Sequence, residues 1–138
     1  MISWAMTTAP ALTKDVIGLA GAFLTSGVIH LARPQVFEPT IPRQLPAPKR
    51  LVYVSGIAEI ACAVGMLVPS TRRYAGWASA ALLLAVWPAN GQMLATAHVR
   101  ARRDPADTRK QVERGVMLAR LPLQIPLIRI ALKAAGRV

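Results

Sequence analysis

The sequence predicts an all-α fold, a four-helix bundle whose helices cross a membrane, and its composition is the first support. Hydrophobic residues make up 54% of the 138 residues and the mean hydropathy is +0.39, although 17 residues are lysine or arginine. These charges stand apart from three apolar runs, residues 16–32, 51–68 and 74–97, in which Glu59 is the only formally charged side chain. A soluble domain of this size has too small a core to bury three such helices on every side.

The length of the runs is the second support. At a rise of about 1.5 Å per residue they span roughly 25, 27 and 36 Å, against about 30 Å of hydrocarbon in a bilayer. A fourth helix is expected at residues 116–135, although it contains Arg120, Gln124, Arg129 and Lys133. A span is favoured because side chains near its ends can extend to the interface and a fourth helix completes a bundle. The alternative is a helix lying in the interface.

The connections between the runs complete a single domain over residues 1–138. Residues 33–50 hold five prolines, so they cannot form one regular helix. We expect this segment to fold back as a cap over one end of the bundle, the alternative being an extended connector. The short turn at 69–73 makes the second and third helices antiparallel neighbours, and residues 98–113 are read as a polar, basic loop.

A small-residue face on the first helix, at Gly18, Ala22 and Ser26, is a candidate for close approach of another helix. The competing interpretation is that small residues are simply common in membrane helices.

The formal net charge of +11 does not predict a nucleic-acid partner, because the basic residues are scattered and form no stripe with aromatic residues between them. They suit contacts with a lipid bilayer. Ten of them lie on the side of the cap, at positions 33, 43, 49, 50, 100, 102, 103, 109, 110 and 114, and five lie on the other side, at 14, 72, 73, 133 and 137. The excess places the cap side in the cytoplasm.

Polar side chains converge at one depth inside the predicted bundle. Glu59 and Asn90 lie roughly 12 and 11 Å from the cap-side ends of their helices, and Gln124 has a similar depth. Arg120 lies one turn above Gln124, and His30 lies near the cap-side end of the first helix. An ionisable group at such depth costs about 2.5–3.5 kcal/mol on insertion scales, so it is usually paired.

Two interpretations of this cluster stay open. One is a ligand pocket that opens toward the cap, formed by His30, Glu59, Asn90, Arg120 and Gln124. The other is a hydrogen-bonded packing cluster in which Arg120 or His30 neutralises Glu59. Coupling between Glu59 and Arg120 is the expected pairing, with His30 as the competing partner.

Motifs for catalysis are not found in the sequence. Cys62 is the single cysteine, so there is no internal disulfide and no CxxC pair, and we expect it to be a packing residue. No cluster of His and Cys has metal-ligand spacing, so no metal is expected. No nucleophile–base pair, phosphate loop or carboxylate pair is recognisable, which favours a non-catalytic protein over an enzyme.

Several short segments resemble the DoxX-like family of small four-helix bacterial membrane proteins. Together they cover about residues 16–128, and their order and spacing are more specific than each segment alone. The segments are Gly27-Val-Ile-His30 followed by Pro34 and Phe37, Ile41-Pro42 with Leu45-Pro46, Ser55-Gly56-Ile-Ala-Glu59-Ile60, Pro88-Ala-Asn90, and Arg120-Leu-Pro-Leu-Gln124.

The resemblance implies a multi-pass protein of the bacterial cell membrane. The function it implies is an accessory subunit of a membrane redox or stress-response complex, with a pocket for a quinone or a lipid head group. The partner would be another membrane protein or further copies of the chain. Alternatives are a quinone-reactive oxidoreductase component that uses Glu59 and His30 for proton transfer, or a small oligomeric transporter. Related proteins perform thiol chemistry with a CxxC pair, which this chain lacks. In relatives with such a cap the termini are cytoplasmic, so the resemblance suggests the orientation opposite to the one that the count of basic residues predicts.

Overall fold

The computed structural model describes residues 8–38, 41 and 44–138, and all of the regular secondary structure in this part of the chain is helical. It contains four α-helices and a 3₁₀ turn, as the predicted all-α fold class requires. The elements are α1 (Lys14–Ala32), η1 (Pro34–Val36), α2 (Pro48–Leu67), α3 (Arg72–Arg103) and α4 (Thr108–Ala134).

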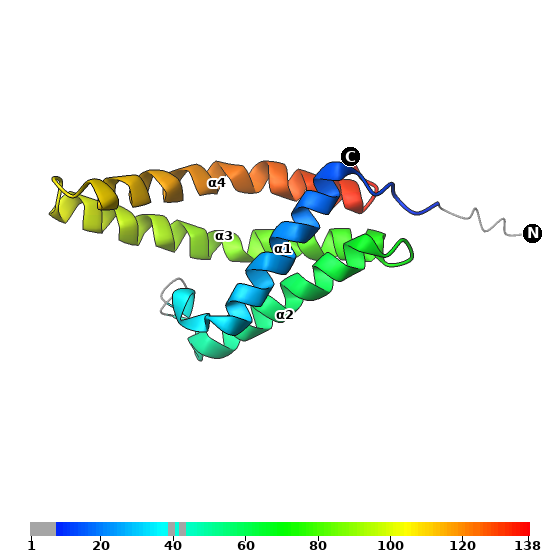
Figure 1. Cartoon of the computed structure of the whole chain (residues 1–138), viewed down its shortest axis with the longest axis horizontal. Helices are drawn as coiled ribbons and strands as arrows, with labels where there is room; N and C mark the ends of the chain where they lie inside the picture. Colours follow the sequence, from blue (N-terminus) through cyan, green and yellow to red (C-terminus); the bar gives the residue numbers. More distant parts are fainter. Residues whose placement is uncertain (1–7, 39–40, 42–43) are drawn as a thin grey trace, which may run out of the picture.

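The helices form two antiparallel pairs, α1 with α2 and α3 with α4 (Figure 1). The pairs meet at the end where α1 begins and α4 ends, and they diverge toward the end that carries η1. We call the first end the closed end and the second the cap end. This divergence leaves the space in which the polar residues lie.

The closed end is fastened by a hydrophobic core and by two charged contacts. Val16 and Met66 are fully buried there, and Cys62 is buried among the same core residues, as expected for a packing residue. Lys133 Nζ of α4 lies 3.0 Å from Asp15 Oδ2 of α1. The buried Arg72 guanidinium donates to the backbone oxygens of Met66, Leu67 and Pro10 at 2.7, 3.2 and 2.6 Å.

The α3–α4 hairpin is longer than the sequence predicted. Residues 98–113 were read as a loop, but α3 runs to Arg103 and α4 starts at Thr108. Arginine, lysine, glutamine and glutamate are good helix formers, so a polar segment need not be a loop. The connection is reduced to residues 104–107, where the Asp107 side chain accepts a hydrogen bond from the Lys110 backbone N–H at 3.3 Å.

The predicted small-residue face is not the place where helices approach most closely. A Cβ added to Gly18 would meet no atom within 4 Å, and Ala22 is exposed. The close approach of α1 and α2 is instead at Gly27 and Gly56, where a Cβ added to Gly27 would lie 2.7 Å from the Gly56 carbonyl oxygen. The four-residue spacing identified the correct helix but the wrong face.

Replacing Gly27 with alanine should therefore destabilise the protein, by about 1–3 kcal/mol of unfolding free energy, because the new methyl group overpacks the α1–α2 contact. Gly18→Ala is the matched control on the same helix, and it should be neutral or stabilising by up to about 1 kcal/mol. Unfolding of both variants in detergent measures the difference. Equal effects of the two substitutions would show that α1 and α2 do not pack through Gly27.

Candidate functional site

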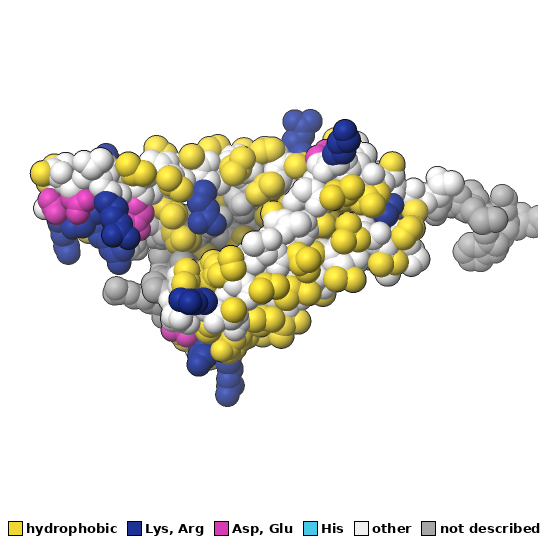
Figure 2. Space-filling model, viewed as in Figure 1, with side chains coloured by type: hydrophobic (Ala, Val, Ile, Leu, Met, Phe, Trp, Pro, Cys, Tyr) yellow, Lys and Arg dark blue, Asp and Glu magenta, His cyan; other side chains and the backbone are white. Residues whose placement is uncertain are grey.

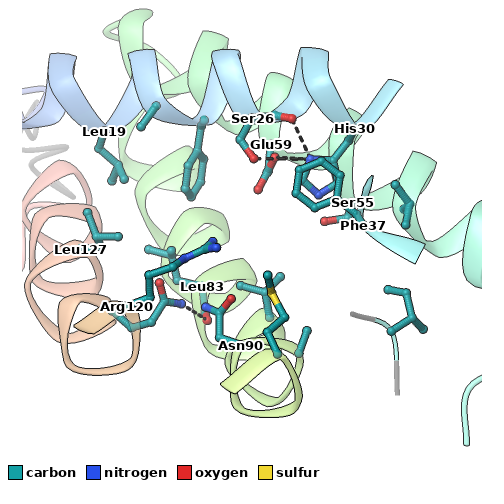
Figure 3. A pocket seen from close by; sticks show the side chains of 18 residues that line it. Leu19, Ser26, His30, Phe37, Ser55, Glu59, Leu83, Asn90, Arg120 and Leu127 are labelled. Carbon is teal, nitrogen blue, oxygen red and sulfur yellow. Dashed lines mark hydrogen bonds and ion pairs between the residues drawn. The ribbon is translucent and has the colours of Figure 1, made fainter. Parts of the chain in front are cut away.

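A pocket of about 260 Å³ lies between the two helix pairs on the cap side (Figure 3). All four α-helices and the segment after α1 contribute to its walls. The five polar residues singled out from the sequence by depth all line it: His30, Glu59, Asn90, Arg120 and Gln124. Their convergence in one pocket is what the depth argument predicted, whereas their pairing differs from the prediction.

The wall formed by α1 and α2 carries a buried acid beside a histidine. Glu59 is 8% exposed and His30 is 9% exposed. His30 Nδ1 lies 2.7 Å from the Ser26 backbone oxygen and 3.5 Å from Glu59 Oε2. A bond of 2.7 Å to a carbonyl requires a proton on Nδ1, so His30 donates mainly to Ser26 and only secondarily approaches Glu59.

Glu59 is consequently the least satisfied polar group of this wall. Its Oε2 atom is buried and accepts no hydrogen bond within residues 8–38, 41 and 44–138. A buried carboxylate oxygen without a donor is unfavourable, and such a group in a native structure requires an explanation. A ligand that donates a hydrogen bond is one explanation that the pocket itself offers.

The segment after α1 closes the pocket as a cap, which supports the folded-back arrangement over an extended connector. The Phe37 ring stacks on the His30 ring, with centroids 3.7 Å apart and planes 11° apart. Gln92 of α3 donates from Nε2 to the Ile41 backbone oxygen at 3.0 Å. Phe37 and Ile41 both line the pocket. Residues 39, 40, 42 and 43, which also belong to this predicted segment, lie outside the described residues.

The opposite wall belongs to α3 and α4 and carries the amides. Gln124 is 6% exposed and donates from Nε2 to the Leu83 backbone oxygen at 3.1 Å. This bond joins α3 and α4 near Pro88, whose missing N–H leaves the neighbouring Leu84 carbonyl without its helical donor. Asn90 is half-buried and lines the pocket from α3.

Arg120 lies at the edge of the pocket and does not pair with Glu59. Its side chain is exposed and points from α4 toward the space that Glu59 faces from the other side (Figure 3). In the described part of the chain, Arg120 forms no ion pair or hydrogen bond, and the ionic partner of Glu59 is His30. The expected Glu59–Arg120 pair is therefore wrong.

The space between the two polar walls is apolar. Leu19 and Phe23 of α1 and Leu83 and Val86 of α3 also line this pocket. The arrangement suits a small amphipathic group better than a metal ion. No group of three or more His, Cys, Asp or Glu residues that could hold a metal occurs among the described residues.

Comparison with known families gives one match. The family model of DUF8561, a domain of unknown function, matches residues 19–135, which include every residue of the pocket. No match was found among curated proteins or among solved structures. The resemblance to DoxX-like proteins is not tested by this match and stays a prediction.

Proposed function

Because the chain belongs to the DUF8561 family, whose function is unknown, we propose its function from its own geometry. The protein is an integral membrane protein, and its pocket binds the head group of a lipid or a quinone. Following the DoxX-like resemblance, it acts as an accessory subunit of a membrane redox or stress-response complex in the bacterial cell membrane.

Two observations support insertion into a membrane. Within the described residues, three helices are long and apolar enough to cross a bilayer, α1, α2 and α4. The third predicted span, α3, is not among them, because residues such as Asn90 and Gln92 lower its mean hydropathy. Only 11% of the most apolar window of α4 is buried inside the molecule, so its hydrophobic side chains face outward.

Large hydrophobic side chains are exposed on each of the four helices, as expected for a surface that faces lipid tails. Figure 2 shows them spread over α1 and α2, with lysine and arginine gathered toward the ends of the elements. They occur on all four helices, and examples are Ile17, Leu24, Val28, Val54, Ile57, Val64, Trp77, Leu84, Val116, Leu118, Leu123 and Ile125. Contact with lipid tails removes this surface from water.

The protein should stay with the membrane fraction after washing at alkaline pH with carbonate. Peripheral proteins are released by this treatment, whereas helices held by burial of apolar side chains in hydrocarbon are not. Immunoblotting of pellet and supernatant measures the partition, and a known peripheral membrane protein is the control. Recovery in the supernatant would contradict the proposal of integral insertion.

The pocket carries the second half of the proposal. A carboxylate with one buried oxygen that accepts no hydrogen bond and an exposed arginine line one largely apolar space, and no side chain of the described residues joins them. A packing cluster would leave its polar groups satisfied. Mass spectrometry of the intact protein, purified in a mild detergent, tests this proposal by detecting a bound lipid or quinone. A mass spectrum that shows only the protein without bound lipid or quinone, even after both have been added, would refute it.

A second candidate is a quinone-reactive component of an oxidoreductase. The contact between His30 Nδ1 and Glu59 Oε2 at 3.5 Å favours it, because such a pair can accept the protons of a quinol. Oxidation of a quinol releases two protons and two electrons, so a redox partner has to accept the electrons. Stoichiometric co-purification of a cofactor-bearing protein distinguishes this candidate from a simple head-group site.

A further inference from the structure

We propose that the pocket recognises a phosphoethanolamine head group, with its ammonium at Glu59 and its phosphate at Arg120. This inference rests on the proposed function, because it requires that the pocket accept a head group. It goes further by assigning the chemical class of the ligand and by giving each charged residue of the pocket a separate role.

The acid end of the pocket calls for a hydrogen-bond donor, preferably a cationic one. Glu59 Oε2 is buried without a hydrogen bond in the described part of the chain, and the Nδ1 proton of His30 is directed to the Ser26 carbonyl. Glu59 points into the pocket from α2 (Figure 3). A primary ammonium supplies the donor that Glu59 Oε2 lacks, and its positive charge strengthens that hydrogen bond.

The other end of the pocket calls for an anion. Arg120 is exposed, lines the pocket and forms no ion pair with any described acid. The amide side chain of Asn90 lies on the same wall and adds hydrogen-bonding capacity. A guanidinium with two parallel N–H donors is suited to a phosphate group.

The order of these groups from outside to inside matches the order along an aminophospholipid. Arg120 is exposed at the edge, whereas Glu59 is buried. Figure 2 shows a notch between the two helix pairs, with apolar side chains along its borders. A lipid can therefore leave its tails among apolar side chains outside the notch, place its phosphate at the edge and insert its ammonium.

The size of the pocket agrees with a head group alone. Its volume of about 260 Å³ is just below the roughly 300–1,000 Å³ of sites for drug-sized molecules. The charges also discriminate between head groups. Phosphatidylcholine has a cation without N–H donors, phosphatidylglycerol has no cation, and a quinone carries neither charge, so each leaves Glu59 or Arg120 without a partner.

The experiment measures binding of short-chain phosphatidylethanolamine, phosphatidylcholine and phosphatidylglycerol to the delipidated full chain, by mass spectrometry of the intact protein in detergent. We expect phosphatidylethanolamine to bind roughly tenfold or more tightly than either of the others, because a hydrogen bond to a charged group is worth about 1.5–3 kcal/mol. This comparison needs no variant, so it does not depend on folding of a mutant.

Substitution of each charged residue by glutamine then shows which residue binds the ammonium and which binds the phosphate. Glu59→Gln should abolish the preference for phosphatidylethanolamine over phosphatidylglycerol, whereas Arg120→Gln should weaken binding of both lipids about equally. Glu113→Gln and Arg129→Gln are the matched controls, because neither residue lines this pocket, and they should leave the preference intact. Free phosphoethanolamine and a short-chain ubiquinone complete the set of probes.

The outcomes separate this inference from the proposal on which it rests. Equal binding of the three lipids, or a preference that survives Glu59→Gln, overturns the phosphoethanolamine assignment. If only the quinone binds, the assignment fails and the head-group pocket stands. If no probe binds, both fail. Displacement of the lipid by micromolar free phosphoethanolamine supports the head-group chemistry but makes the soluble compound its source, whereas its failure to compete supports the lipid.

Discussion

Replacing Arg72 with glutamine should lower the free energy of unfolding by about 3 kcal/mol or more, the largest stability effect expected for a single polar residue of this chain. Its guanidinium is buried and donates to three backbone oxygens, two at the carboxyl end of α2 and one at Pro10. Loss of these donors leaves the Met66 and Leu67 carbonyls unpaired where the helix dipole is negative.

Arg73→Gln is the matched control for this substitution. Arg73 is the next residue of α3, has the same charge and is only partly buried, so its loss should change stability by less than about 1 kcal/mol. Unfolding of both variants in detergent, followed by circular dichroism, measures the difference. Equal stability losses would show that the effect comes from the charge at this turn and not from the contacts of Arg72.

Arg72 also shows what the sequence could not reveal. It was counted among the basic residues of a tight turn, where exposure is the ordinary state of an arginine. Nothing in the local pattern indicates that Pro10, 62 positions away along the chain, brings a third carbonyl to it. Contacts between distant segments depend on packing, and hydropathy describes only one segment at a time.

The helices themselves were predictable because their apolar runs are long and nearly free of charge. Three of the four predicted starts differ from the structure by two or three residues, at α1, α2 and α3. The error lies in the hairpin of α3 and α4, where polarity was taken as evidence of a loop. Polar helix formers can continue a helix beyond its apolar run, and the break falls only at residues 104–107, which include Pro105.

The sequence predicted the depth of the candidate-site residues along their helices, but not the directions in which their side chains point. Counting residues along each helix brought Glu59, Asn90 and Gln124 to one depth, and all three line the pocket. The same count cannot tell which way a side chain points around its helix. For this reason the sequence favoured Arg120 as the partner of Glu59, and the stacking of Phe37 on His30 was not foreseen.

Glu59 should therefore be energetically coupled to His30, which it contacts, and not to Arg120, which only the depth argument paired with it. In a double-mutant cycle on the delipidated protein, Glu59→Gln and His30→Gln should show an interaction energy of about 0.5–3 kcal/mol, as groups in contact do. His30 Nδ1 and Glu59 Oε2 are 3.5 Å apart, and both side chains are buried. Glu59→Gln and Arg120→Gln should instead be additive to within about 0.5 kcal/mol, because they share no contact.

Addition of phosphatidylethanolamine turns the same cycle into a test of the pocket. A ligand that holds its ammonium at Glu59 and its phosphate at Arg120 makes the two residues depend on one bound molecule. Each single variant should then lose most of the stabilisation that the lipid gives, and the double variant should lose little more. Unfolding in detergent with and without the lipid measures both cycles. If the stability losses of Glu59→Gln and His30→Gln are additive without lipid, the contact between the two residues contributes nothing to stability. If the stability losses of Glu59→Gln and Arg120→Gln remain additive with saturating lipid, the two residues do not bind the same head group.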